Sequence, residues 1–256
     1  MDHPPGDHPT CRFHDRAEDY ARYRPGYPDD AVSALLLGLP AACTVADVGA
    51  GTGILSRLLA ARGARVLAVE PNAAMRAYAA HHPNVHWSDG TAEATRLSDA
   101  SIDLVTIAQA FHWVDVAPTL REFARILRPH GRLAILWNRR TRDDPFTLGY
   151  RTVLETMDAE APAERSQFDP AVVTAAGGFH HLRTLEFVNA QRLTEEQLIG
   201  RARSTSTVPL TGPRSERIHG MLRDLHARYR AADGTAEMVY RTEVFLWERL
   251  VTHATR

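Results

Sequence analysis

The sequence predicts an α/β fold in which a mainly parallel sheet carries helices on both faces. Between residues 45 and 137, short apolar runs typical of buried strands alternate with segments of helical spacing. A glycine-rich turn joins the first of these runs to the helix that follows it. This repeated strand–helix–strand order requires parallel strands linked by right-handed crossovers.

The individual elements follow from the hydrophobic pattern and from turn residues. The pattern predicts strands over 45–49, 65–69, 85–87, 102–107 and 132–137, and helices over 53–62, 72–80 and 119–127. Asn72 is a suitable N-cap for the second of these helices. Pro129-His130-Gly131 is expected to end the third helix before the last strand begins.

The segments on either side of this core carry weaker patterns. Residues 1–12 are expected to be disordered, and residues 13–256 to form a single domain, because we find no internal repeat and no linker. Within that domain, 13–40 would form a helical lid, 41–140 the ligand-binding core and 141–256 the remainder of the sheet with a pocket for a second ligand. In that last part we expect helices over 145–159, 194–204 and 216–231, and strands over 182–188 and 238–247.

Composition excludes several functional classes. The formal net charge is −1, whereas a nucleic-acid-binding protein usually carries a basic excess. All 30 basic side chains are arginines, which excludes a lysine nucleophile or a P-loop lysine. The surroundings of Cys11 match no zinc-ligand spacing, so we expect no metal. We find neither an apolar signal region nor about 18 consecutive apolar residues, so we expect a cytoplasmic protein without a membrane partner.

The most informative motif is the glycine-rich loop from Asp47 to Gly53. Its glycines Gly49, Gly51 and Gly53 allow a tight turn and a close approach of a ligand to the backbone. The spacing is G-x-G-x-G, and Ile54 stands where the dinucleotide fingerprint requires its third glycine. The P-loop pattern also fails, since no Gly-Lys pair follows.

Two acidic positions follow the next two strands. Glu70 ends the second strand, where its carboxylate can accept hydrogen bonds from both hydroxyls of a ribose. Ala92 and Glu93 follow the third strand, where a loop commonly lies over an adenine ring. The alternative for Glu70 is an ordinary exposed glutamate at a strand end, and the alternative for Ala92 and Glu93 is a polar turn that starts a helix.

At this point the sequence resembles the class I S-adenosylmethionine (SAM)-dependent methyltransferases, in particular the type-11-like subgroup that includes trans-aconitate methyltransferase-like proteins. The resemblance covers about residues 13–250. It rests on the glycine loop and on four strings, Tyr-Ala-Arg-Tyr-Arg-Pro-Gly-Tyr-Pro at 20–28, Val-Glu-Pro-Asn at 69–72, Gly-Thr-Ala-Glu at 90–93 and Ala-Gln-Ala-Phe-His-Trp-Val-Asp at 108–115. It implies a Rossmann-like sandwich with a seven-stranded, mostly parallel sheet, an antiparallel last strand and an N-terminal helical lid.

The resemblance also implies a set of SAM-binding residues, namely Tyr20, Arg24, Asp47, Gly49, Gly51, Gly53, Glu70, Pro71, Asn72, Ala92, Glu93 and Gln109. Asp47 would support the loop, and Glu70 would bind the ribose. Gln109 would face the methionine end. Tyr20 and Arg24 would lie over the cofactor, with Arg24 able to pair with the SAM carboxylate through its guanidinium fork.

Methyl transfer from a sulfonium requires orientation of the acceptor, exclusion of water and, for some acceptors, removal of a proton. His112 follows the fourth strand and is our candidate general base, because histidine titrates near neutral pH. Phe111, Trp113 and Asn138 are candidate acceptor-binding residues. Packing of the loop is the alternative role for His112 and both aromatic residues, and turn capping for Asn138.

We therefore expect a SAM-dependent methyltransferase acting on a small molecule, a biosynthetic intermediate or an organic acid, as a monomer or homodimer. Methylation of oxygen, nitrogen or carbon stays open. The alternatives are a SAM-binding regulator or cyclase without methyl transfer, an NAD-dependent oxidoreductase and an RNA methyltransferase. The position of Ile54 argues against the oxidoreductase, and the charge balance argues against the RNA enzyme.

Overall fold

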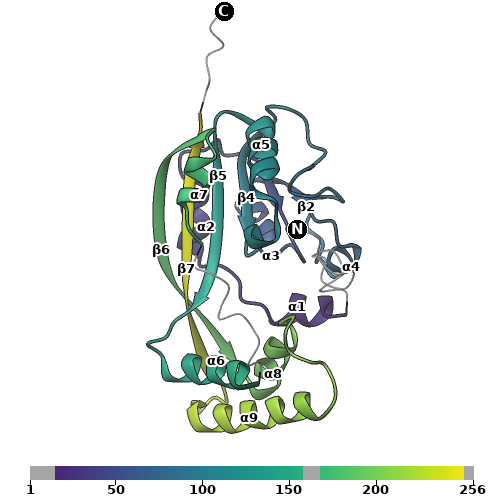
Figure 1. The fold of residues 1–256 in the computed structure, drawn as a ribbon, viewed down its shortest axis with the longest axis vertical. Coiled ribbons are helices and arrows are strands. Elements are labelled where there is room, and N and C mark those ends of the chain that lie inside the picture. Colours follow the sequence, from purple (N-terminus) through teal and green to yellow (C-terminus); the bar gives the residue numbers. More distant parts are fainter. Residues whose placement is uncertain (1–14, 158–167, 251–256) are drawn as a thin grey trace, which may run out of the picture. The chain divides into compact units, whose positions relative to one another are not determined.

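The computed structural model describes residues 15–157 and 168–250, and its central feature is a seven-stranded sheet (Figure 1). The strands are β1 (Thr44–Val48), β2 (Arg65–Val69), β3 (Val85–Ser88), β4 (Ile102–Ala108), β5 (Leu127–Arg140), β6 (Phe179–Leu193) and β7 (Ala236–Arg249). They lie in the order β3-β2-β1-β4-β5-β7-β6. Each neighbouring pair from β3 to β5 is parallel, which confirms the parallel sheet expected from the sequence.

Helices precede and separate the strands. They are α1 (Ala17–Tyr23), α2 (Asp29–Leu36), α3 (Ile54–Ala60), α4 (Ala73–Ala77), α5 (Val116–Ile126), α6 (Pro145–Met157), α7 (Ala171–Ala175), α8 (Glu195–Arg203), α9 (Pro213–Tyr229) and the short 3-10 helix η1 (Phe111–Trp113). In the described ranges, none of them has both the length and the apolar character needed to cross a membrane.

The chain divides into two compact units. The helical unit comprises 15–26, 138–157 and 188–241 among the described residues, and it contains α1, α6, α8 and α9. The sheet unit comprises 27–137, 168–187 and 242–250. The long strands β5, β6 and β7 each contribute residues to both units. Helices α1 and α2, which the sequence led us to group as one lid, belong to different units.

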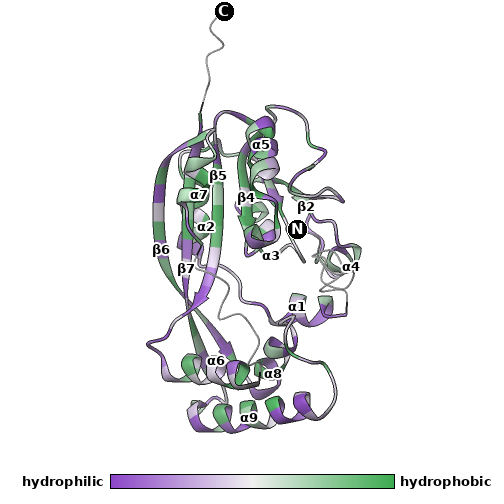
Figure 2. Ribbon diagram, viewed as in Figure 1, coloured by the Kyte–Doolittle hydropathy of each residue, from purple (hydrophilic) through white to green (hydrophobic). Residues whose placement is uncertain are grey.

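The sheet unit has a hydrophobic core on each face of its sheet. Alternate residues of β4 point to opposite faces, so Val105 and Ile107 pack with Phe123 of α5, whereas Leu104 packs with Leu59 of α3. Helices α5 and α7 thus cover one face, and α2 and α3 cover the other. Figure 2 shows β4 largely in hydrophobic colours, as expected for a strand buried on both sides.

The helical unit has a separate core. Tyr150 of α6, Leu198 of α8, Leu222 of α9 and Tyr240 of β7 are all buried in it. Helix α8 begins with a capping box, in which the Thr194 side chain accepts from the Gln197 backbone N–H and the Gln197 side chain accepts from the Thr194 N–H. These bonds fix the start of α8.

Three elements differ from the sequence predictions or extend them. The predicted start of the last core strand at residue 132 is wrong, because β5 begins at Leu127, directly after α5, and runs through Pro129-His130-Gly131. The pairing of β4 with β5 shifts between Ile102 and Leu104, because β5 has extra residues at this point. They form an irregularity in which His130 has φ +62°. Helix α7 was not predicted. Within the sheet unit, β7 runs opposite to β5 and β6 (Figure 1), which confirms the antiparallel last strand.

Candidate functional site

The glycine-rich loop connects β1 to α3. Gly49, Gly51 and Gly53 have φ of +65°, +59° and +74°, a region that other residues adopt only with strain. A Cβ atom at Gly49 would lie 2.8 Å from Cβ of Ala110, and one at Gly53 would lie 2.9 Å from the Trp87 ring. Glycine is therefore needed at Gly49 and Gly53 both for the backbone conformation and for the packing of the loop on its neighbours.

Asp47 lies directly before this loop and is buried. Its carboxylate accepts hydrogen bonds from the hydroxyls of Ser56 in α3, at 2.5 Å, and of Thr106 in β4, at 2.8 Å. Burial raises the pKa of Asp47 to about 6, against the opposing effect of these two bonds. The side chain thus ties β1 to the adjacent strand and helix beneath the loop, a position that suits the supporting role expected from the sequence.

Glu70 lies at the end of β2, and its side chain holds the glycine loop. Oε2 accepts a hydrogen bond from the backbone N–H of Gly51 at 2.8 Å, and Oε1 accepts one from the N–H of Asn72 at 2.9 Å. Burial raises the pKa of Glu70, and the two backbone bonds oppose that rise. Since a carboxylate oxygen has two acceptor positions, both oxygens can accept a further hydrogen bond from a ligand hydroxyl.

Two buried polar atoms beside these contacts lack a hydrogen-bond partner within the described part of the chain. They are Oγ1 of Thr52, which follows Gly51, and Nδ2 of Asn72. Oδ1 of the same Asn72 caps α4 by accepting from the N–H groups of Ala74 and Met75, which confirms the predicted N-cap. Because buried polar groups are almost always hydrogen-bonded, this pair indicates that a polar ligand completes the site. Thr52 was not among the predicted site residues, since a threonine between glycines carries no signal of burial.

The loop after β3 is joined to the start of α5. Oε1 of Glu93 accepts a hydrogen bond from the backbone N–H of Asp115 at 3.0 Å and one from the hydroxyl of Thr119 at 3.5 Å. Ala92 is buried in the core on the α5 face of the sheet. The adenine-binding role of both residues stays a prediction, and the structure adds a capping role for Glu93.

The segment after β4 holds the remaining candidates of the sheet unit. Gln109 has φ of +59°, an unusual backbone conformation for a residue with a side chain and one that is often found at functional sites. Phe111 is buried and meets Phe168 edge-on at 5.3 Å, which is the packing role left open by the sequence. The exposed His112 ring lies 4.5 Å from the ring of Trp113 and 5.4 Å from that of Trp137.

Three predicted site residues, Tyr20, Arg24 and Asn138, belong to the helical unit. The Arg24 guanidinium lies 4.7 Å from the centre of the Tyr20 ring. Asn138 donates a hydrogen bond to the carbonyl of Gly26 at 2.9 Å, and its side-chain oxygen accepts one from Asn189. The structure therefore brings together Tyr20 with Arg24 in this unit, and Asp47, Glu70 and Asn72 with the glycine loop in the sheet unit.

One group of metal-ligand type was not predicted. Side-chain ligand atoms of His180, His181 and Glu248 lie within 4.8 Å of one another at the surface of the sheet unit. His181 has φ of +54°, a left-handed backbone conformation near the start of β6. Neither histidine belongs to a recognisable zinc spacing, so the group could not be expected from the sequence.

Comparison with known proteins identifies similar chains. A profile of the methyltransferase domain family matches residues 46–135. An uncharacterised methyltransferase of Mycobacterium tuberculosis, Rv3342, is 48% identical over 127 residues, and this match covers 49% of the present chain and 50% of the relative. The chain thus spans about half the length of the mycobacterial relatives it matches.

Two further similarities extend over more of the chain. An uncharacterised methyltransferase-like protein of Schizosaccharomyces pombe, C25B8.10, is 30% identical over 241 residues, covering 90% of this chain and 93% of the relative. The solved structure of a proposed type II methyltransferase from Anaeromyxobacter dehalogenans superposes with a TM-score of 0.69 at 26% identity, covering 90% of this chain and all of the other.

Proposed function

Since the chain belongs to the methyltransferase family of these relatives, we propose that it binds SAM and transfers the methyl group to a small-molecule acceptor. The observation that carries this proposal is the arrangement of Glu70 around the glycine loop. A buried carboxylate held by the N–H of Gly51 is suited to accept hydrogen bonds from the hydroxyls of a ribose. The Thr52 hydroxyl and the Asn72 amide, which lack partners in the described part of the chain, supply further polar groups beside it. These residues fit a nucleoside ligand.

The roles of individual residues follow from these positions. The oxygens of Glu70 accept hydrogen bonds from the two ribose hydroxyls, while Gly49, Gly51 and Gly53 allow the ligand to approach the backbone closely. Asp47 holds β1, β4 and α3 together beneath the loop. Ala92 and Glu93 flank the adenine, Pro71 and Asn72 border the ribose, and Gln109 faces the methionine end, as the family resemblance implies.

When bound, SAM supplies a methyl group already activated by its sulfonium. What the chain adds is orientation, exclusion of water and proton transfer. His112 is exposed at the end of β4, where parallel α/β sheets bind their ligands, and it accepts a proton from the acceptor when that acceptor is a hydroxyl or an acidic carbon. Trp113, half-buried against His112, borders the acceptor.

Calorimetric titration with SAM, S-adenosylhomocysteine and NAD tests the cofactor. We expect micromolar dissociation constants, about 8 kcal/mol of binding free energy, for both SAM-type ligands and none for NAD. The variant Gly51→Val, whose side chain would both strain a left-handed position and fill the approach to the loop, should lose this binding. Absence of SAM binding by the wild-type protein contradicts the proposal, and NAD binding would favour an oxidoreductase.

Methyl transfer itself needs a second experiment, because a SAM-binding regulator would also bind SAM in the calorimetric titration. Labelled SAM is incubated with the wild-type protein and a panel of small hydroxyl, amine, carboxyl and active-methylene compounds, and transfer of label is measured. Transfer of label to any compound by the wild type, with no transfer by the Gly51→Val variant, supports methyltransferase activity. Tight SAM binding with no transfer to any class would favour the regulator.

A further inference from the structure

Three side chains of metal-ligand type lie together at the surface of the sheet unit. They are His180 and His181 near the start of β6 and Glu248 near the end of β7. One ligand atom from each lies within 4.8 Å of the other two. The centres of the two imidazole rings are 4.1 Å apart, and Nδ1 of His181 lies 3.6 Å from Oε2 of Glu248. We call these three residues the His–His–Glu group.

The backbone at His181 accounts for the side-by-side placement of two consecutive rings. In a regular strand, neighbouring side chains point to opposite faces of the sheet and their rings diverge. His181 instead has φ of +54°, a left-handed conformation that is unfavourable for a residue with a side chain and is enriched at ligand-binding positions. The backbone N–H of Leu250 donates to the carbonyl of Gly178 at 2.8 Å, which fixes the end of β7 beside the start of β6. Strand pairing thereby adds Glu248 to the two histidines.

Two imidazoles and one carboxylate form a donor set that zinc prefers. Zinc bonds to histidine nitrogen and carboxylate oxygen are about 2.0–2.2 Å long, so the ligand atoms of a tetrahedral site lie about 3.4 Å apart. The atoms of the His–His–Glu group need to approach one another only slightly from their 4.8 Å limit. Their side chains are free to do so by rotation, since those of His181 and Glu248 are 70% and 43% exposed. Mg²⁺ and Ca²⁺ take oxygen ligands instead.

An ion pair alone does not account for this group. An exposed pair between a histidine and a glutamate stabilises a protein only slightly, and it needs a single imidazole. Such a pair would leave the second ring unexplained, and also the left-handed backbone that brings both rings to the carboxylate. A cation that binds all three side chains explains both features.

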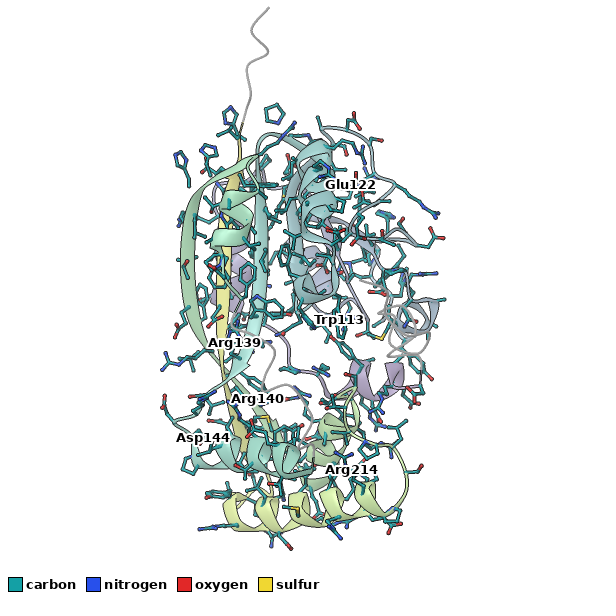
Figure 3. All side chains as sticks on the ribbon, viewed as in Figure 1. Trp113, Glu122, Arg139, Arg140, Asp144 and Arg214 are labelled. Carbon is teal, nitrogen blue, oxygen red and sulfur yellow. The ribbon has the colours of Figure 1, made fainter. Side chains whose placement is uncertain are left out.

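The His–His–Glu group lies at the amino edge of the sheet. Glu248 lines a pocket together with Asp103 and Arg128, which stand at the starts of β4 and β5. The glycine loop follows the carboxyl end of β1, and Trp113, labelled in Figure 3, follows that of β4, at the opposite edge from the end of β7. A cation held by the group would therefore take no part in methyl transfer.

We propose that His180, His181 and Glu248 bind one zinc ion, with water as a fourth ligand, and that this ion links β6 to β7. Strand β6 is the last in the sheet order, so β7 is its only neighbour among the described strands. A zinc ion across the two strands would hold this edge strand in place. We expected no metal from the surroundings of Cys11, and the proposed site lies elsewhere in the chain.

The test uses the full chain without an affinity tag, freed of metals with a chelator and titrated calorimetrically with zinc chloride. We expect a dissociation constant below about 10 μM for zinc, and no binding of Mg²⁺ or Ca²⁺. His180→Gln and Glu248→Gln should each weaken zinc binding by about tenfold or more, because each removes a ligand. His181→Asn should do the same while keeping the fold, since asparagine adopts the left-handed conformation readily.

Two control variants test whether the zinc is bound at this place. His81→Gln removes an exposed histidine from the other pair of consecutive histidines, His81-His82, which has no third ligand among the described residues. Cys11→Ser removes the thiol that lies among the N-terminal histidines of the sequence. Both variants should bind zinc within about twofold of the wild type. A wild-type protein that binds no zinc overturns the proposal, and so does zinc binding that Cys11→Ser abolishes and Glu248→Gln leaves unchanged.

Thermal unfolding and hydrogen exchange test the link between the strands. Zinc at about 100 times its dissociation constant should raise the melting temperature of the wild type by about 5–10 °C. It should also slow the exchange of backbone amides in residues 179–187 of β6 severalfold. Glu248→Gln should show neither effect, and its melting temperature without zinc should lie within about 2 °C of that of the wild type.

Two outcomes of these measurements would overturn the proposal. One is a Glu248→Gln variant that is less stable without zinc but responds to zinc as the wild type does, which would give Glu248 a purely structural role. The other is zinc binding by the wild type that leaves the exchange of β6 unchanged, which would show that the ion does not link the strands. Neither outcome bears on SAM binding, which the earlier titration measures separately.

Discussion

Glu70 and Gly51, 19 positions apart, are joined by a hydrogen bond of 2.8 Å from the Gly51 backbone N–H to Oε2 of Glu70. The bond links the end of β2 to the loop after β1, two segments that lie side by side because β1 and β2 are parallel neighbours. The carboxylate proposed to bind the ribose therefore also fixes the loop that approaches it, and the two roles cannot be separated by removing the side chain.

Glu70→Gln keeps the length of this side chain and removes its charge. One of the two backbone N–H donors would then face an amide NH₂ in place of an oxygen, and the ribose would lose a charged acceptor. We expect SAM binding to weaken by about 1–3 kcal/mol, measured by calorimetry. Asp89→Asn, at an exposed acid paired with Arg96, changes the net charge equally and should leave binding unaltered. A dissociation constant within twofold of the wild type would place the ribose elsewhere.

Asp47 should make stability depend on pH. Its pKa rises from an ordinary 3.8 to about 6 in the folded protein, so the folded state binds more protons than the unfolded state between these values. Stability is therefore lost as pH rises through this window. The shift of about two pKa units corresponds to a loss of about 3 kcal/mol. The Asp47→Asn variant has no titrating group at this position. Between pH 4 and pH 7.5, its free energy of unfolding in urea should therefore rise by up to this amount relative to that of the wild type. If the unfolding free energies of variant and wild type differ by the same amount at both pH values, burial does not raise the pKa of Asp47.

Thr52→Val tests whether an unpartnered hydroxyl awaits a ligand. Valine has the same shape without the buried Oγ1, so the ligand-free protein should gain about 1 kcal/mol of unfolding free energy. Affinity for S-adenosylhomocysteine should fall, because the ligand loses a partner. Urea unfolding and calorimetry measure the two effects, which are expected to have opposite signs. A loss of stability with unchanged affinity would give the hydroxyl a purely structural role.

Gly53→Ala should be more destabilising than its backbone conformation alone explains. Its φ is +74°, and its added Cβ would meet the Trp87 ring at 2.9 Å. Gly177→Ala is the matched control, with φ of +76° and no atom within 4 Å of the new Cβ. We expect a loss of about 1 kcal/mol for the control and about 1–3 kcal/mol more for Gly53→Ala, from chemical denaturation of both. Equal losses would show that Trp87 moves aside without cost.

His112→Gln tests the proposed base once an acceptor is known. Glutamine keeps polarity at this exposed position but cannot take up a proton near neutral pH. We expect kcat to fall by about 10²-fold or more, with the dissociation constant of S-adenosylhomocysteine unchanged. Retained turnover would leave His112 in a packing role against Trp113 and Trp137, and would favour an acceptor that needs no base, such as a carboxylate.

Local patterns in the sequence determine much of the fold. The predicted strand over 65–69 coincides with β2, and Asn72 caps α4 as expected, because both depend on neighbouring residues alone. The β5 strand was predicted too short, because Pro129 and Gly131 normally end an element and only pairing with β4 shows that the strand absorbs them. Helix α7 has five residues, too few to show a helical period.

The candidate site likewise has features that the sequence predicts and features that only the folded structure reveals. The spacing of the glycines and the position of Glu70 could be read from the chain, because strand ends and loops are adjacent in sequence. The hydrogen bonds from Arg24 to Ser204 could not, since the two residues are 180 positions apart and each resembles an ordinary surface residue. These contacts appear only when the segments after α1 and α8 are assembled, and the missing partner of Thr52 likewise appears only in the folded structure.

The alternation along β4 also limits how this gene can change in length. One residue inserted between Leu104 and Ile107 would turn every later side chain of the strand toward the opposite helices, exchanging the contents of the two cores. Strand β5 shows how extra residues are tolerated, because its irregularity around His130 lies before Leu133, where its own alternation begins. Insertions and deletions among relatives should therefore gather at strand ends, while the central strands vary only by substitution.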